Sequence, residues 1–390
     1  MKKFLLCAAF AATMFSMSAQ EITIEKLWGL EEVPTVADCR QGVGLNGKFY
    51  INDKANQKVL VYGENGLEDQ EFEGGANCGI NIDQAGNIIV SLATFPNAYW
   101  TMDNETAMIR VINPVSGEVT DLPLASEANH PGRLDVLGRA FGDLMGDGEL
   151  YLPYSVTSVT QGETFNGTIC RHAFSDGDLL VDDSYAPILS PTPNVDNMTI
   201  VSAVVDADGN DAVFYYQRGA NPYLYYWNGD NLEGEQIAIP TTDNGMIRCN
   251  QHGADFFGFN GKNYVVYPLG AANNAYFDGF AILEVGADAP LFVKEPTIAV
   301  AANGYQANWL NAEVTDQGVM IYQYAPGKSM EVYKMSLPTT GVSSIAAEKT
   351  VAGVKYVNVA GQVSNVPFEG VNMVVTSYTD GSKSTVKVVK

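Results

Sequence analysis

One short pattern occurs six times along this chain, and it constrains the fold more than any other feature of the sequence. Each copy is a short apolar segment, a turn of Asn, Asp and Gly, and a second segment rich in Val, Ile, Tyr or Phe. The copies begin at Gly42, Gly79, Arg139, Ser202, Ala254 and Asn311. Because Gly, Asn and Asp tolerate the positive φ of tight turns, each copy is predicted to be a β-hairpin. Recurrence of one unit indicates a repeat architecture.

Further strand-like segments follow each hairpin. After the first come "KVLVYG" and "LEDQEF", and after the fourth come "YLYYWNG" and "EGEQIAI". Four antiparallel strands form one blade of a β-propeller. The sixth unit has only "MEVYKMSL" after its hairpin, and residues 22–28, "ITIEKLW", can supply the missing outer strand. Pairing of the two ends would close the ring and cover a sheet edge. The sequence therefore predicts an all-β fold, a six-bladed β-propeller over residues 20–338.

These repeats resemble the broad NHL and YncE-like group of secreted propellers. The resemblance lies in the repeat itself, and it implies a fold without implying a particular activity.

The N-terminal residues are typical of a secretory signal peptide. Lys2 and Lys3 precede an apolar stretch over residues 4–15, which is followed by the small residues "SMSAQ". This order predicts a signal peptide over residues 1–19 with cleavage before Gln20. No later segment has about 18 consecutive apolar residues, so no transmembrane segment is expected in the mature protein. We therefore expect an exported protein, at the cell surface or outside the cell, with the periplasm as the alternative.

The composition changes after Pro338. Residues 339–350 are a linker of small residues, and residues 351–390 alternate in the manner of short strands, which predicts a small β-sandwich-like module. "YVNVAGQ", "GVNMVV" and the terminal "KVVK" resemble the C-terminal sorting domain of type IX (Por) secretion, over about the last 45 residues. The resemblance implies passage across the outer membrane, with the secretion machinery as a partner. A purely stabilising β-module is the alternative.

Charge and cysteine content exclude several classes of function. The formal net charge is −23 and the acidic residues are spread along the chain, so nucleic acid and anionic lipid are not expected partners. The mature chain would keep Cys39, Cys78, Cys170 and Cys249, which lack the spacing of a metal site. Cys39 and Cys78 precede neighbouring inner strands, so a disulfide between them is one alternative and unpaired thiols are the other.

Two turns carry several aspartates. Asp143 and Asp147 in "FGDLMGDGELYLP" resemble the calcium loops of FG-GAP propeller repeats, and Asp206 and Asp208 in "VDADGND" are similarly placed. Calcium prefers six or more oxygen ligands, and Met145 stands where one would be needed. Ordinary hairpin turns are therefore predicted, and calcium is the one cofactor left open.

The loops before the inner strands are the predicted binding site. In a propeller these loops surround the channel on one face, together with the loops between second and third strands. This set contains much of the chain's Arg and His, although the whole chain has only 22 Lys and Arg and 3 His. The candidate ligand-binding residues are Arg40, Asn77, His130, Arg133, Asp135, Arg139, Arg248, Asn250, His252, Asp255, Tyr305, Asn308 and Trp309.

A polar ligand, a glycan above all, is expected over this mouth. Arg can hold a carboxylate through two parallel hydrogen bonds, and Trp309 would offer a stacking face. The alternative is that these side chains only satisfy the polar backbone of the channel wall.

No catalytic signature accompanies these residues: G-x-S-x-G and H-E-x-x-H are both absent from the sequence. A binding protein is therefore favoured over an enzyme. The enzyme alternatives are a carbohydrate lyase that uses His and Arg, or a metal-dependent hydrolase. In the second, Asp38, Asp135 and Asp255 would hold a cation, as in gluconolactonase-like propellers. An adhesive or structural surface protein is the remaining alternative.

Overall fold

The computed structural model describes most of the chain in two compact units. The described residues are 22–31, 33, 39–92, 108–124, 136–153, 157–158, 163–164, 169–185, 187, 189–190, 199–217, 220–240, 246–248, 253–271, 278–297, 308–337, 351–358, 361–379 and 383–389. Ile22–Ser336 forms the larger unit, and the smaller unit contains Leu337–Lys390. The described part of the chain contains no helix that could span a membrane.

The described residues of the larger unit form six sheets of four or five strands, numbered here sheet 1 to sheet 6 along the chain. Sheet 1 contains β2 (Gly42–Leu45), β3 (Lys48–Asp53), β4 (Lys58–Gly63) and β5 (Gly66–Glu73). Sheet 2 contains β6 (Ile80–Ile82), β7 (Ile88–Ser91), β8 (Met108–Ile112) and β9 (Val119–Pro123). Sheet 3 contains β10 (Phe141–Gly142), β11 (Gly148–Pro153), β14 (Ile169–Ser175) and β15 (Asp178–Tyr185).

The second half of the unit repeats this order with small additions. Sheet 4 contains β17 (Ile200–Val205), β18 (Asp211–Tyr216), β19 (Tyr223–Asn228) and β20 (Asn231–Gln236), with β16 (Leu189–Ser190) parallel to β20. Sheet 5 contains β22 (Asp255–Phe259), β23 (Lys262–Ala271), β24 (Gly279–Glu284) and β25 (Phe292–Lys294), with β21 (Met246–Arg248) paired to the end of β23. Sheet 6 contains β26 (Trp309–Thr315), β27 (Gly318–Ala325), β28 (Ser329–Ser336) and β1 (Thr23–Leu30). A two-stranded sheet of β12 (Thr157–Ser158) and β13 (Glu163–Thr164) lies between β11 and β14 in the chain.

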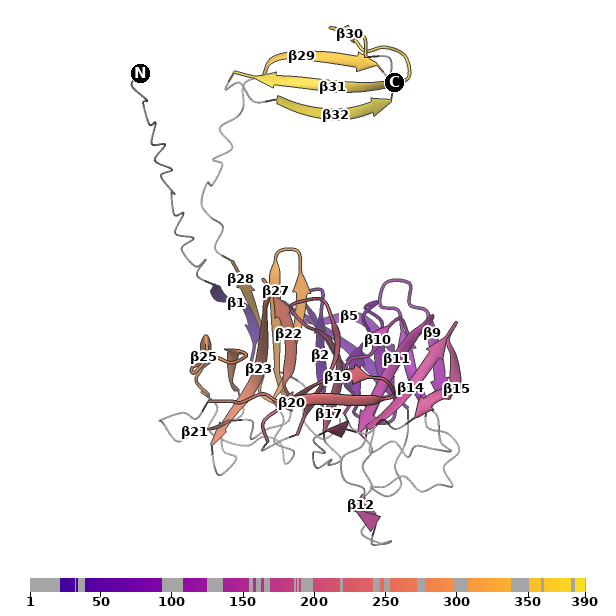
Figure 1. The fold of residues 1–390 in the computed structure, drawn as a ribbon, viewed down its shortest axis with the longest axis vertical. Coiled ribbons are helices and arrows are strands. Elements are labelled where there is room, and N and C mark those ends of the chain that lie inside the picture. Colours follow the sequence, from indigo (N-terminus) through magenta and orange to yellow (C-terminus); the bar gives the residue numbers. More distant parts are fainter. Residues whose placement is uncertain are drawn as a thin grey trace, which may run out of the picture. The chain divides into compact units, whose positions relative to one another are not determined.

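The first strands of the six sheets contact one another in a closed order. β2 contacts β6 and β26, β22 contacts β17 and β26, and β11, next to β10, contacts β17. A bridge between Asp83 and Ala140 joins the second sheet to the third. Apolar side chains of neighbouring sheets pack face to face in this ring, as Val43 and Ile80 do between sheets 1 and 2. The larger unit is therefore an all-β propeller (Figure 1).

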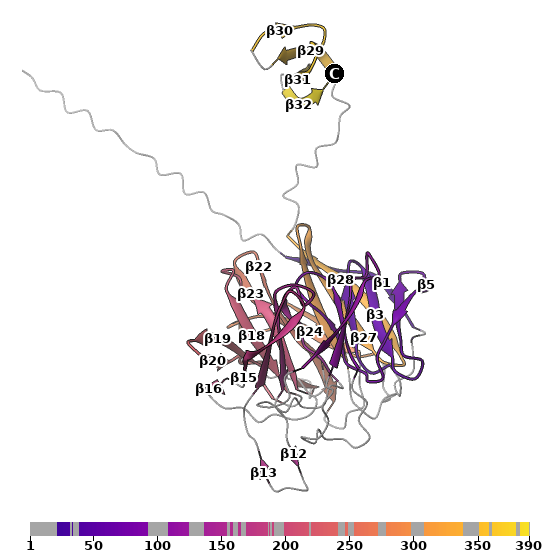
Figure 2. The same ribbon diagram turned by 90° about the vertical axis from the view of Figure 1, so that its right-hand side faces the viewer.

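The hairpin turns have the predicted chemistry. Asn46 and Gly47 join β2 to β3 with φ of 52° and 76°, and Asn260 and Gly261 join β22 to β23 with φ of 51° and 71°. In Figure 2 the turn between β22 and β23 lies at one end of the ring, and β12 and β13 lie at the other. The end that carries the turns between first and second strands is called the hairpin face below, and the opposite end is called the loop face.

The two ends of the larger unit meet in sheet 6. β1 pairs antiparallel with β28, from Thr23 opposite Ser336 to Leu30 opposite Met330. Lys26 Nζ also lies 2.5 Å from Glu331 Oε1. This confirms the predicted pairing of residues 22–28 as the outer strand of the last sheet.

The smaller unit contains one sheet, with the strand order β30 (Val363–Ser364), β29 (Val351–Asn358), β31 (Val371–Tyr378) and β32 (Lys383–Val389). Among those residues of this unit whose side chains the structure describes, Asn372 is the one that is buried. The described residues of this unit form one four-stranded sheet, and the β-sandwich-like module stays a prediction.

Candidate functional site

The structure describes six of the predicted loop-face residues with their side chains: Arg40, Asn77, Arg139, Asp255, Asn308 and Trp309. Arg248 ends β21, but its side chain lies outside the description, as do Asp38, His130, Arg133, Asp135, Asn250, His252 and Tyr305. The predicted gathering of basic side chains at the loop face therefore stays a prediction.

Arg139 and Asp255 form an ion pair across the axis of the ring. Arg139 lies just before β10, and its Nη2 donates to Asp255 Oδ2 on β22 at 2.8 Å and to the Ala312 carbonyl on β26 at 2.8 Å. Asp255 is buried, and its carboxylate also accepts the backbone N–H groups of Phe256 and Ala312. Between this pair and the loop face a cavity of only about 20 Å³ remains. The two side chains therefore brace sheets 3, 5 and 6, and the space beside them could hold about one water molecule.

Asn308 and Trp309 are part of the wall between sheets 5 and 6. Asn308 donates to the Gly279 carbonyl at 2.8 Å and accepts from Gln323 at 2.9 Å. Trp309 is only 4% exposed, and its indole N–H donates to the Arg40 carbonyl. The indole ring is packed in the core, so it does not present the stacking face expected of it.

Asn77 and Arg40 lie at the entry to the inner strands. Asn77 is buried, and its Oδ1 accepts the backbone N–H of Cys78 at 2.7 Å.

Cys39, Cys78 and Cys170 are all buried cysteines outside any disulfide. The alternative disulfide between Cys39 and Cys78 is therefore not formed.

The aspartates of the two hairpin turns accept hydrogen bonds from their own turns and from neighbouring segments. Asp143 Oδ1 accepts the backbone N–H of Met145 and the side-chain amide of Asn87, both at 2.9 Å. Asp147 Oδ1 accepts the hydroxyl of Ser175 at 2.6 Å. Asp206 accepts the backbone N–H groups of Asp208 and Asn210, with the carboxylate oriented toward its own turn. Among the described residues, no group of three or more His, Cys, Asp or Glu side chains could hold a metal ion.

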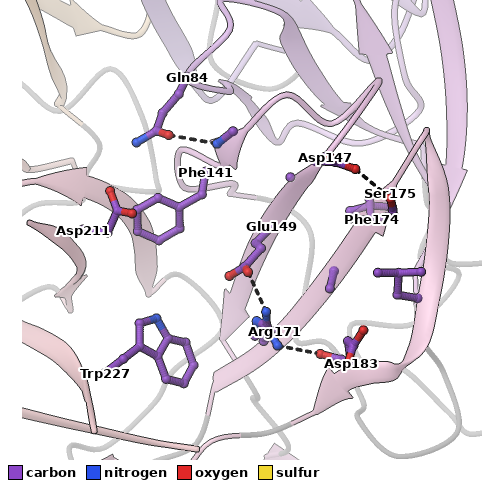
Figure 3. Close-up of a pocket in the computed structure, with 14 residues that line it drawn as sticks. Gln84, Phe141, Asp147, Glu149, Arg171, Phe174, Ser175, Asp183, Asp211 and Trp227 are labelled. Atoms are coloured by element: carbon purple, nitrogen blue, oxygen red, sulfur yellow. Dashed lines mark hydrogen bonds and ion pairs between the residues drawn. The ribbon is translucent and has the colours of Figure 1, made fainter. Parts of the chain in front are cut away.

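A pocket of about 610 Å³ opens between sheets 3 and 4 on the hairpin face (Figure 3). Its walls come from turns and strands of both sheets, with Gln84 from the turn between β6 and β7 of sheet 2. Figure 3 shows Trp227 and Asp211 of sheet 4 on one side, and Glu149 and Arg171 of sheet 3 on the other.

An ion pair lies on the sheet 3 wall. Arg171 Nη2 is 2.5 Å from Glu149 Oε1, and the hydroxyl of Tyr151 donates to Glu149 Oε2 at 2.5 Å. Arg171 Nη1 also donates to the Asp183 carbonyl at 2.9 Å. Burial by itself favours the neutral acid of Glu149, but the hydrogen bonds from Arg171 and Tyr151 outweigh it and lower the pKa of Glu149. The carboxylate is therefore held ionised and fixed in position.

Aromatic rings surround the guanidinium of Arg171. Its Cζ lies 5.4 Å from the ring centroid of Tyr185 and 5.8 Å from that of Trp227. Trp227 also packs against Tyr151, with the two ring centroids 5.9 Å apart. The indole is half-buried and lines the pocket, so its orientation is fixed before any ligand arrives.

The remaining polar groups of the pocket are mainly carboxylates. Asp147, Asp183 and Asp211 line it together with the Glu149–Arg171 pair. The balance of charge is therefore negative, unlike the basic mouth predicted for the loop face.

Sequence reasoning missed this pocket because its lining residues come from turns and strands of three different repeats. One signal was present: "TICRHAFS" has the polar pair Arg171 and His172 in the middle of a strand, and "YLYYWNG" has Trp227 and Asn228 before its final Gly.

No family model and no curated protein matches this chain. Among solved structures it is similar to the N-terminal domain of Nup159, with 8% identity and a TM-score of 0.34 over 82% of this chain and 96% of that one. It is also similar to BBS1N in complex with ARL6DN, with 11% identity and a TM-score of 0.40 over 81% of this chain and 97% of that one. Similarity at this level does not extend to function.

Proposed function

We propose that this protein is an exported six-bladed propeller that binds a glycan, without turning it over, in the pocket between sheets 3 and 4. The observation that carries this proposal is the fixed Trp227 indole opposite the Glu149–Arg171 ion pair.

The blade count rests on the closed order of the inner strands. Six sheets follow one another around the ring, and the last is completed by β1. Export rests on the basic, apolar and small-residue order of residues 1–19, and passage through type IX secretion rests on the tail resemblance.

The chemistry of the pocket suits a sugar ring. A pyranose has an apolar face that packs on an aromatic ring and hydroxyl groups that hydrogen-bond to carboxylate and guanidinium groups in pairs. Because Asp147, Asp183 and Asp211 line the pocket, a uronate would be repelled there, and a neutral or amino-bearing glycan fits better. A carboxylate-bearing glycan remains the expectation only for the loop face.

Binding is favoured over hydrolysis by the state of Glu149. Its lowered pKa and the engagement of both oxygens leave it without a proton to donate at neutral pH, which a glycosidase acid requires. Among the described residues of the pocket it is the carboxylate most firmly positioned, and its role is to orient Arg171.

A glycan array with residues 20–390, followed by titration of the best ligand, tests the proposal. Trp227→Ala should weaken binding about 30-fold, because truncation of a central aromatic costs about 2 kcal/mol. Asp211→Asn changes an exposed lining group without touching the core, so it should weaken binding while the melting temperature stays unchanged.

Arg248→Ala serves as the matched control for the loop face. Loss of binding in Arg248→Ala with full binding in Trp227→Ala would place the ligand at the loop face and overturn the pocket assignment. Release of unsaturated or reducing sugar products would favour the enzyme alternative instead. An array with no bound glycan would contradict the proposal and favour an adhesive or structural function.

A further inference from the structure

We infer that the protein carries a second glycan subsite, between sheets 6 and 1, so that one propeller holds two glycan segments at once. This inference rests on the proposed function. It starts from a second pocket of about 390 Å³, lined by Trp28 of β1 and by residues 46–48 and 63–68 of sheet 1.

The second pocket repeats the chemistry of the first. Trp28 comes from the neighbouring sheet, as Trp227 does, and an ion pair again lies on the wall: Lys48 Nζ is 2.7 Å from Glu68 Oε2. Lys48 begins the second strand of its sheet, and Glu149 is the second residue of the equivalent strand in sheet 3. Each pocket thus contains an indole, a cation and a carboxylate, although the ion pair joins different strands in the two repeats.

The walls of the second pocket are fixed by the structure beneath them. The Trp28 ring stands at 84° to the ring of the buried Phe49, with centroids 5.7 Å apart. The turn at Asn46 and Gly47 is held by sheet 6, since Gly47 N donates to the Tyr322 hydroxyl at 2.7 Å. A preorganised pocket loses less entropy on binding than one that must be ordered by its ligand.

The carboxylate of Glu68 lies against Gly63, which has no side chain. A Cβ added to Gly63 would lie 2.7 Å from Glu68 Oε1, so the carboxylate occupies space that any other residue would fill. Leu67, which is 58% exposed, adds an apolar surface beside it. These groups give a sugar ring both a packing surface and hydrogen-bond partners.

The two pockets lie on the same face and at opposite crevices of the ring. Both are lined by the turn between the first and second strands of their sheet. The order of the six sheets puts three between the pockets in either direction. Sites so arranged would engage a polymeric glycan, or two chains of it, with a gain from effective concentration that neither pocket has alone.

Titration calorimetry with maltohexaose, cellohexaose and N-acetylated chitohexaose tests the inference. All three hexasaccharides are uncharged. The native protein should bind the preferred hexasaccharide at two sites per chain. Trp28→Ala and Trp227→Ala should each leave one site, and the double variant none. Because Trp28 also packs against the hydrophobic core, a second variant is needed. Glu68→Ala changes a partly exposed side chain, and it should weaken one site about tenfold with an unchanged melting temperature.

The outcomes separate the two proposals. One site in the native protein, lost in Trp227→Ala and kept in Trp28→Ala and Glu68→Ala, would overturn the second subsite and leave the first. No binding of any of the three hexasaccharides would overturn the second subsite, and the glycan array decides the proposed function separately.

Discussion

Glu149 shows how one carboxylate is held ionised inside a partly buried wall. Burial raises the pKa of such a group, but the hydrogen bonds from Arg171 and Tyr151 and the charge of Arg171 lower it further than burial raises it. A carboxyl group whose pKa is lower in the folded state contributes stability above its unfolded pKa, and this contribution is lost as the pH falls through the folded value.

Glu149→Gln should therefore lower the free energy of unfolding at pH 7 by about 1.5 kcal/mol, the lower end for a charged hydrogen bond, since both partners keep some exposure. The difference from the native protein should shrink as the pH falls below the ordinary glutamate value of 4.5. Urea unfolding across a pH series measures it, with the exposed Glu235→Gln as control. A difference that grows in acid would contradict the account.

Gly44 is a residue whose identity is set by the neighbouring sheet. A Cβ at this position would lie 1.9 Å from Cγ of Tyr322 in sheet 6, and the Gly44 backbone N–H and carbonyl are both bonded to the side-chain amide of Asn311. The two sheets can approach this closely only because no side chain intervenes.

Gly44→Ala should destabilise the propeller by about 1–3 kcal/mol, the usual range for overpacking a filled core. Gly146→Ala is the matched control, since a Cβ there would be 3.7 Å or more from any other atom, and its effect should stay within about 0.5 kcal/mol. Thermal or chemical denaturation of both variants gives the comparison. Equal effects would mean that the contact between sheets 1 and 6 is looser than described.

At the scale of elements, β1 decides whether the ring is closed. It pairs with β28 along seven residue pairs, and its Lys26 reaches Glu331, which also receives Lys294 Nζ at 2.6 Å and the Tyr333 hydroxyl at 2.7 Å. Lys294 and these hydrogen bonds keep the pKa of Glu331 lowered although burial alone would raise it. The outer strand is thus held both by its ladder and by a partly buried ionic network.

Deletion of residues 20–29 should expose the edge of β28, lower the melting temperature and promote self-association, because an unpaired edge strand is a template for pairing. Light scattering and a thermal melt measure the two effects. A deletion variant that stays monomeric and melts at the native temperature would count against closure of the ring by β1.

At the scale of the whole molecule, Arg139 joins sheets that are far apart in the chain. Arg139 and Asp255 are separated by 116 positions, and their side chains are 15% and 5% exposed. Removal of one partner leaves the other charge buried without its counterion, which is costlier than loss of a surface pair.

Arg139→Gln should therefore lower the free energy of unfolding by about 3–5 kcal/mol. Lys262→Gln, which breaks an exposed pair with Glu284, should cost less than about 1 kcal/mol. Guanidinium unfolding of both variants makes the test, and similar small losses in the two would show that the axial pair is not a brace.

The sequence determined the local features of this protein. Turns of Asn and Gly at residues 46–47 and 260–261, with strands on both sides, predict hairpins because these residues tolerate the positive φ that such turns require. The hairpin recurs six times, and the sixth unit lacks one strand. These two features were sufficient to predict a propeller closed by residues 22–28. Both features depend on neighbours in the chain or on the count of repeats.

The tertiary structure decided which side chains from different repeats meet. The sequence predicts that Trp309 stacks on a ligand, but in the structure its ring is buried in the core. The ring is covered because sheet 6 packs against sheet 1. Trp227 and Arg171 come together only because sheets 3 and 4 are neighbours in the ring, and Arg139 reaches Asp255 only because the ring is closed. Such contacts depend on distances across the closed ring, and no spacing along the chain encodes them.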